Sequence, residues 1–295
     1  MIYSLKYFIC ILLLLNNVFA QPTHHVTISY SNKEQAILYL NSVKYLSTSK
    51  YWPEINPGLF FQNIKRNIET PDYLFAGRNT NFCSYAAIGY VFLQKDPLGY
   101  VQLMMDLYQN GEAFYGSTKF NPSARVRKSA GQILYEGELD RNEADQVLFF
   151  TLADHFKGYL NIFNKKYNQG DEQKIWASTN LSKFNRMLRA MFKDDIHSRG
   201  SDLIRPDIPN LVSFLNERLK QGQVYLYLNN SVLRRKNHYK TKKGIPTHYV
   251  VLLGISEKNN TATLTYWDTG YKTQKTINIR TFRWILYGIS WSVNK

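Results

Sequence analysis

The stretch of sequence that determines the fold reads Cys83-Ser84-Tyr85-Ala86-Ala87-Ile88-Gly89-Tyr90-Val91-Phe92-Leu93. This run is apolar on nearly every side of a helical wheel, which predicts a helix buried in the core. Cys83 lies in the first turn of this helix, where unpaired backbone N–H groups and the positive end of the dipole stabilise a thiolate. The same N–H groups can donate to the oxyanion that forms when a thiolate attacks a carbonyl.

The segments on either side of this run have mainly helical patterns. Upstream, the sequence predicts a short strand and two helices, at residues 25–30, 32–46 and 59–68. Ser31 or Asn32 is the expected cap of the first of these helices. Downstream, helical patterns occur at residues 98–108, 143–167, 181–192 and 208–220. We therefore expect the middle region, residues 98–222, to be largely helical.

The period of the pattern changes at residue 223 to that of β-strands. Strand composition is found at residues 224–228, 248–255, 261–267, 273–279 and 289–293, and a short helix is predicted at residues 280–286. Asn259-Asn260 predicts a hairpin turn between the second and third of these strands. The expected fold class is therefore α+β, with a helical N-terminal part that packs on a C-terminal antiparallel sheet.

The first twenty residues have the layout of a signal peptide. Lys6 is their only charged residue, an apolar stretch follows at residues 7–15, and Ala20 before Gln21 offers a cleavage point. The apolar stretch is too short to span a bilayer as a helix, although a retained amphipathic anchor is an alternative. We expect residues 1–20 to be removed and residues 21–295 to form a single domain with an N-terminal extension at 21–71. The protein would then be secreted or periplasmic, with no transmembrane span.

Cleavage would leave Cys83 as the only cysteine, because the other one, Cys10, lies in the predicted signal peptide. A lone thiol cannot form an internal disulfide, and secreted proteins often retain one for its chemistry. A buried and inert cysteine is the alternative. The full chain has a formal net charge of +15 and a pI near 9.6, so it attracts polyanions. No nucleic-acid-binding signature occurs, so we expect an anionic envelope polymer or membrane rather than nucleic acid.

Two further residues can complete a catalytic arrangement with Cys83. A cysteine nucleophile needs an imidazole within hydrogen-bond reach, and the imidazole needs a third group that orients it. His248 begins one predicted strand and Asp268 ends the next, so antiparallel pairing brings both to one edge of the sheet. Taken alone, His248 would be interpreted as an ordinary histidine at the start of a strand, and Asp268 as an aspartate in a turn. Their order after Cys83 favours a triad of nucleophile, base and orienting acid.

Three motifs carry a resemblance to a known family. They are Cys83-Ser84-Tyr85-Ala86-Ala87, His248-Tyr249-Val250-Val251-Leu252-Leu253-Gly254 and Tyr266-Trp267-Asp268-Thr269-Gly270. In this order they resemble the papain-like cysteine peptidase superfamily, and within it most of all the bacteriocin-leader-processing (double-glycine) peptidases and their secreted relatives. The resemblance covers residues 72–295 in the order of elements and is close only at the three motifs. It implies a papain-like fold and the Cys-His-Asp triad.

The chain departs from this family at one position. Such families place a glutamine about six residues before the cysteine to complete the oxyanion hole, and Gly77 stands there in this chain. We expect Asn79 to supply the missing donor. For Asn81 we expect the role of N-cap of the cysteine helix, since asparagine is favoured at that position.

The remaining polar features predict a binding surface but no metal site. The one concentrated basic cluster, residues 234–243, leads directly into His248 and should border the cleft. It would recruit an acidic substrate or envelope polymer, and a solvated hairpin tip is the alternative. His24, His25, His155 and His197 show no zinc-ligand spacing, so we predict surface histidines, no metal and no cofactor.

Together these features predict a secreted cysteine hydrolase that cleaves a peptide or isopeptide bond of a peptide or protein substrate through an acyl-enzyme on Cys83. Peptidoglycan amide hydrolysis and acyl transfer use the same triad and are alternatives within the enzyme class. A non-catalytic basic binding protein on a degenerate papain-like scaffold is the alternative outside it, because the glutamine is missing.

Overall fold

A computed structural model describes residues 30–43, 46–77, 80–133, 142–158, 166–230, 233 and 245–293. The predicted signal peptide, residues 25–29 of the predicted first strand, Asn79 and the basic cluster at 234–243 lie outside these ranges. Within the described ranges no helix is long and apolar enough to cross a membrane.

The helical part comes first in the chain and most of the sheet comes last, as the sequence predicts. The α-helices are α2 (Lys33–Ser42), α3 (Pro57–Glu69), α4 (Cys83–Lys95), α5 (Pro97–Asn110), α6 (Ala124–Ser129), α7 (Glu143–His155), α8 (Leu181–Met191), α9 (Leu211–Gln221) and α10 (Ile279–Ile285). Short 3₁₀ turns occupy Pro71–Tyr73 and Asp171–Gln173. The strands are β1 (Ala113–Tyr115), β2 (Thr118–Phe120), β3 (Asp195–Gly200), β4 (Val224–Leu228), β5 (His248–Lys258), β6 (Thr261–Asp268), β7 (Tyr271–Asn278) and β8 (Leu286–Val293). The chain is therefore a mixed α+β protein.

One sheet dominates the C-terminal half. Its six strands pair antiparallel in the order β3-β8-β4-β5-β6-β7, and β1 and β2 form a separate hairpin. The sheet also contains a strand that the sequence did not predict, because β3 belongs to the middle region, expected to be largely helical, and pairs along β8 from Asp195↔Val293 to Gly200↔Gly288. Only one of the six residues of β3 is buried, so no apolar alternation marks it in the sequence.

Three predicted helices are longer than the observed ones. The helix predicted at residues 143–167 ends at His155, and Gly158 soon after it has a left-handed φ of 98°. The helix predicted from residue 208 begins at Leu211, because a residue before a proline, here Pro209, avoids helical geometry. The helix predicted at residues 32–46 ends at Ser42, although its start at the Asn32 cap is confirmed.

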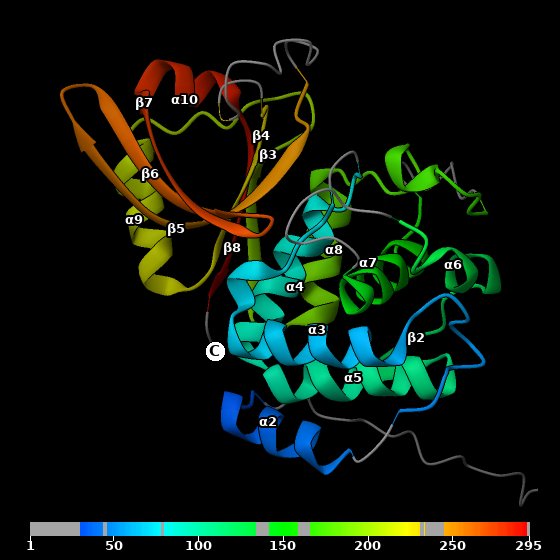
Figure 1. The fold of residues 1–295 in the computed structure, drawn as a ribbon. Helices are drawn as coiled ribbons and strands as arrows, with labels where there is room; N and C mark the ends of the chain where they lie inside the picture. Colours follow the sequence, from blue (N-terminus) through cyan, green and yellow to red (C-terminus); the bar gives the residue numbers. More distant parts are fainter. Residues whose placement is uncertain are drawn as a thin grey trace, which may run out of the picture.

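The sheet has helices on both faces (Figure 1). On one face, side chains such as Tyr225, Tyr249 and Trp267 join the large core formed by α2 to α8. On the other face, Val224 and Val250 join a smaller core under α9 and α10. All five residues of β4 are buried, because successive side chains enter opposite cores.

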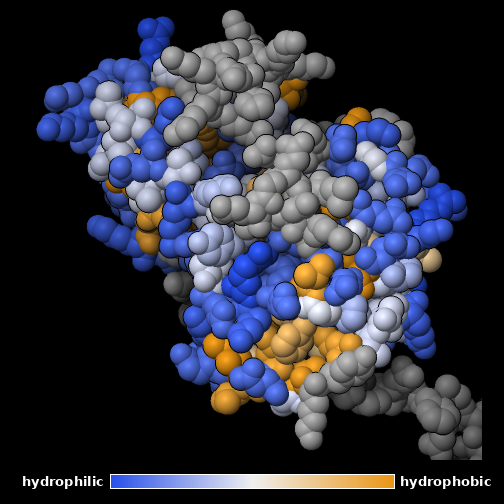
Figure 2. All heavy atoms as spheres, viewed as in Figure 1, coloured by the Kyte–Doolittle hydropathy of each residue, from blue (hydrophilic) through white to orange (hydrophobic). Residues whose placement is uncertain are grey.

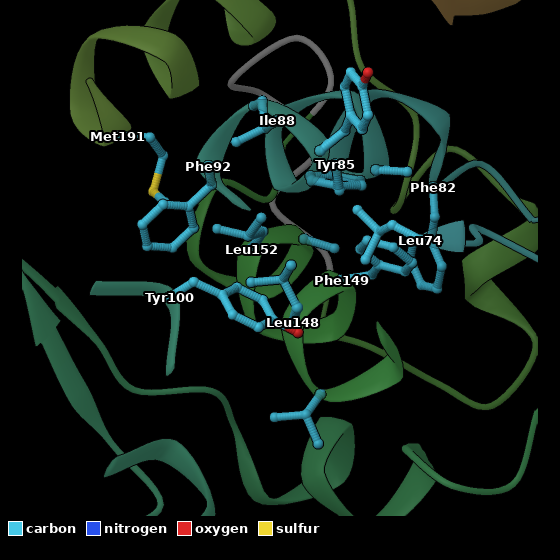
Figure 3. Close-up of a cluster of buried hydrophobic side chains, with 14 of the residues drawn as sticks. Leu74, Phe82, Tyr85, Ile88, Phe92, Tyr100, Leu148, Phe149, Leu152 and Met191 are labelled. Carbon is cyan, nitrogen blue, oxygen red and sulfur yellow. The ribbon is translucent and has the colours of Figure 1, made fainter. Parts of the chain in front are cut away.

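Helix α4 lies at the centre of the larger core. Ten of its 13 residues, 84–93, are buried. Figure 3 shows Phe92 of this helix beside Leu152 of α7, with Leu148 in the same buried cluster. A Cβ at Gly89 would lie 3.0 Å from Leu148, so glycine permits this close approach. The packing fixes the direction of the helix that begins at Cys83.

Figure 2 shows one face of the molecule, on which hydrophilic residues cover most of the described surface. A larger apolar area lies in the lower part of this view, around α2 and α5. Leu38 on α2 is 70% exposed and is one of several large apolar side chains that face solvent.

Candidate active site

Cys83 is the first residue of α4 and is partly exposed. Its predecessor Phe82 is the N-cap and has no polar side chain that could accept a hydrogen bond from the first turn. The N–H groups of this turn are therefore not capped by that side chain, and the sulfur lies at the positive end of the helix.

His248 and Asp268 meet at one edge of the sheet, as the sequence predicts. Val251 pairs with Trp267, so Asp268 at the end of β6 comes within reach of His248 at the start of β5. The Nε2 atom of His248 lies 2.5 Å from Oδ1 of Asp268. The imidazole side chain is only 5% exposed and the carboxylate 22%, so the pair is shielded from water.

The thiol of Cys83 completes this arrangement through a hydrogen bond with the imidazole of His248. Because Nε2 contacts Asp268, Nδ1 is the ring nitrogen left for the sulfur. The backbone of Tyr249 forms a further hydrogen bond with the thiol. The three residues that the sequence singles out are thus in one connected group.

The electrostatics of this group favour a thiolate and an imidazolium. Burial raises the pKa of the Cys83 thiol, but the charge and hydrogen bond of His248 and the backbone of Tyr249 lower it by more, so it lies below its ordinary value. Burial lowers the pKa of His248, but the charges of Asp268 and Cys83 raise it to about 10. Near neutral pH the ion pair is therefore the favoured state.

A cavity of about 450 Å³ lies beside Cys83. Its described walls come from the approach to α4, the segment before α8, and strands β4 and β5 with the residues leading into β5. They are formed by Asn81, Cys83, Ser84, Ile175, Ser178, Thr179, Tyr227, Ile245, Pro246, Thr247 and Tyr249. These residues are aromatic, aliphatic, hydroxyl-bearing or amide-bearing, and none of them carries a formal charge besides the thiolate. The cavity can hold an uncharged group next to the sulfur.

The prediction that Asn81 caps α4 is wrong. Its side-chain amide donates to the carbonyl of Lys174 at 2.9 Å and to Oγ of Ser178 at 3.2 Å. These hydrogen bonds connect the residues just before α4 to the segment before α8, which forms part of the cavity wall. Asn79 lies outside the described residues, so its predicted role stays a prediction. Gly77 has a φ of 85°, a conformation that side chains such as glutamine rarely adopt.

Lys183, which no sequence motif pointed to, lies behind the cavity wall. This side chain is buried, and its Nζ donates to the hydroxyl of Tyr85 at 2.8 Å and to the carbonyl of Ser178 at 3.0 Å. Burial, with a smaller contribution from the charge of Arg186, lowers the pKa of Lys183 to about 7. A usable signal was its position four residues before Met187, on the apolar face of α8.

Of the other histidines that the sequence predicts at the surface, His24 and His25 lie outside the described residues. His155 and His197 are exposed, and the ring of His197 stacks on Trp291 with centroids 5.5 Å apart. In the part of the chain that the structure describes, no three His, Cys, Asp or Glu side chains are grouped to hold a metal ion.

No protein-family model matches this sequence, and no curated protein is significantly similar to it. The geometry around Cys83 is therefore the basis on which a function can be argued.

Proposed function

We propose that the chain is a secreted cysteine hydrolase of the papain-like type that cleaves an amide bond in a peptide or protein. One observation carries this proposal: a partly exposed cysteine at the start of a buried helix is hydrogen-bonded to an imidazole that a carboxylate holds from its other side. A purely structural buried thiol needs neither the imidazole nor the carboxylate.

The order of the elements supports the papain-like assignment. The cysteine helix comes before the sheet in the chain and packs against it, with α4 and β5 contributing to the same core. His248 begins a strand and Asp268 ends the neighbouring strand. This is the layout that the three sequence motifs imply.

In the proposed reaction, the thiolate of Cys83 adds to the carbonyl carbon of the amide and the carbonyl oxygen takes the negative charge. His248 gives its Nδ1 proton to the leaving nitrogen, the C–N bond breaks, and the acyl group remains on the sulfur as a thioester. Water then attacks the thioester while His248 takes a proton from it. The carboxylic acid leaves and the thiolate is restored, so no cofactor is needed.

Stabilisation of the oxyanion is the weaker part of this site. The backbone N–H of Cys83, at the start of α4, is suitably placed to donate. Gly77 offers no side chain at the position where the resembling families have a glutamine. If no other side chain takes that role, turnover should be about two to three orders of magnitude slower than with two donors.

A binding protein on the same scaffold is the second candidate, and Gly77 is the observation that favours it. Such a protein would retain the cavity beside Cys83 but would not turn over an acyl group.

Covalent labelling by an epoxide inhibitor of thiol proteases tests the first proposal. Intact-mass measurement should show one adduct on Cys83 in the wild type and at least a tenfold slower reaction in His248→Ala. His197→Ala is the matched control, because this histidine is exposed on β3 and should not change the rate. Absence of labelling in the wild type would favour the binding protein. Labelled protein would then justify a screen of peptides and of peptidoglycan fragments.

A further inference from the structure

The turn that follows β3 presents two aliphatic side chains to solvent. Leu203 is 86% exposed and Ile204 is 74% exposed, more than any other large hydrophobic side chain in the described residues. Ser201 fixes the shape of this turn, since its Oγ accepts from the backbone N–H groups of Leu203 and Ile204 at 3.2 and 2.8 Å. The Ser201 N–H also donates to the carbonyl of Ile204. The exposure is therefore a property of an ordered turn.

Arginine side chains join this turn to helix α10. Nε of Arg205 donates to the carbonyl of Trp284 at 2.6 Å, and its guanidinium lies 5.6 Å from the centre of the Trp284 ring. Arg283 donates to the carbonyls of Ile208 and Pro209. The ring of Trp284 is itself 45% exposed. The turn and the helix thus form one surface with three bulky apolar groups.

This surface has a basic rim. Arg280 lies one helical turn before Trp284, and its side chain is exposed. The charged residues of the turn, of the end of β3 and of α10 are Arg199, Asp202, Arg205, Asp207, Arg280 and Arg283. Asp202 accepts a hydrogen bond from the N–H of Leu181. Four arginines against two aspartates give a positive local charge, in a chain of net charge +15.

The surface lies at the same end of the sheet as His248. Gly200 pairs with Gly288 of β8, and Leu228 of β4 pairs with both Leu286 and His248. Three strand spacings, about 14 Å, separate the end of β3 from His248. Figure 1 shows the segment between β3 and α9 passing beside α10 at this end.

From these observations we infer that Leu203, Ile204 and Trp284 dock the protein onto an anionic lipid surface. Aliphatic tips gain free energy in the acyl region, tryptophan prefers the boundary with the headgroups, and arginines attract anionic lipids. A protein partner fits less well, because three projecting side chains are few for a stable interface of about 1,600 Å². Docking would bring the start of β5, and with it Cys83, close to the membrane. The inference does not depend on catalysis at Cys83.

Vesicle sedimentation of the full chain tests this inference. We expect binding to vesicles of phosphatidylcholine with 30% phosphatidylglycerol and at least tenfold weaker binding to phosphatidylcholine alone. The double variant Leu203→Ser/Ile204→Ser should bind the anionic vesicles at least tenfold less, because each buried aliphatic side chain contributes roughly that factor. Leu38→Ser, at a similarly exposed position on α2, should bind like the wild type. All variants retain residues 1–20, so differences between them come from the substituted position.

The fluorescence of Trp284 provides a second measurement. It reports contact of this ring with the acyl chains, which attraction by the overall charge alone would not produce. Lipids brominated in the acyl chains should quench the tryptophan fluorescence of the wild type on anionic vesicles, and Trp284→Phe should lose most of this quenching. Equal vesicle binding by the double variant, or quenching that survives in Trp284→Phe, would overturn the inference. Self-association of the wild type that the double variant loses would overturn it as well, since the surface would then contact a second copy.

Discussion

At the scale of single residues, Cys83 and His248 each stabilise the charged form of the other. Burial alone opposes both charges. The imidazolium of His248 lowers the pKa of Cys83, and the charge of Asp268, followed by that of Cys83, raises the pKa of His248. Asp268 holds the imidazole by its Nε2 atom, which leaves the ring correctly turned toward the sulfur. If the imidazole were removed, burial and the charge of Asp268 would remain, and both raise the pKa of the Cys83 thiol.

This balance predicts the pH dependence of alkylation by iodoacetamide. The rate for the wild type should reach half of its plateau well below the free-cysteine pKa of about 8.5, because the thiolate is the reacting form. In His248→Ala the midpoint should move above that of a free cysteine. His197→Ala should match the wild type. The same midpoint in wild type and His248→Ala would show that the imidazole does not set the state of the thiol.

Lys183 predicts a pH-dependent stability. Its pKa is about 7 in the folded protein and close to 10.5 when unfolded, so between these values the unfolded state binds more protons. Stability from this group therefore rises with pH above 7. Lys183→Met lacks this pH-dependent contribution to the free energy of unfolding. The stability of the wild type minus that of the variant should increase by about 1 kcal/mol per pH unit between pH 7 and 9. Urea unfolding across this range measures it, and a constant difference would contradict the burial of a lysine without its proton.

At the scale of elements, the β5–β6 hairpin has the turn that its residues favour. Asn259 and Asn260 both have positive φ, 50° and 59°, as a two-residue type I′ turn requires. Asparagine tolerates this conformation better than most residues do, and glycine tolerates it better still. The turn sets the register from Lys258↔Thr261 to Gly254↔Thr265, and a bulge between Leu252 and Gly254 then shifts it by one residue. Turn and bulge together bring Asp268 to His248.

Asn260→Gly should therefore raise the free energy of unfolding by about 0.5–1 kcal/mol. Asn260→Ala removes the carboxamide that makes asparagine tolerant of this backbone and keeps a Cβ at a left-handed φ, so it should lower the free energy of unfolding by about 1 kcal/mol. Thermal unfolding followed by circular dichroism distinguishes the two. A stability order with alanine above glycine would show that the turn does not have this geometry in solution.

At the scale of the whole molecule, Trp267 connects the sheet to the helical part. Its ring stacks on Tyr90 of α4 with centroids 4.4 Å apart and an interplanar angle of 6°. Its Nε1 donates to the carbonyl of Asp72, 195 residues earlier in the chain. The residue lies next to Asp268, so the same contact that joins the two parts also supports the site.

Trp267→Ala should lower the free energy of unfolding by about 3–5 kcal/mol, because it leaves a cavity between β6 and α4. Helical circular dichroism and tryptophan fluorescence should both shift to lower urea concentration by the same amount. Leu203→Ala is the control, because this side chain is 86% exposed, and it should change stability by less than about 0.5 kcal/mol. A shift in one probe alone would show that the sheet and the helices unfold separately.

Features that depend on near neighbours in the chain could be predicted from the amino-acid sequence. The Asn32 cap, the Asn259-Asn260 turn and the apolar run after Cys83 act over a few residues, so their composition was sufficient. The order of Cys83, His248 and Asp268 also predicted which residues meet, since a hairpin places two of them and a helix start places the third.

Features whose partners are distant in the chain depend on how the elements pack. The side chain of Asn81 binds the carbonyl of Lys174, 93 residues away, instead of capping α4, and Lys183 is held by Tyr85, 98 residues away. β3 becomes a strand because the edge of β8 offers free backbone groups to it. Local propensity carries no information on such partners, because hydrogen bonds and burial across the fold form only when the elements pack.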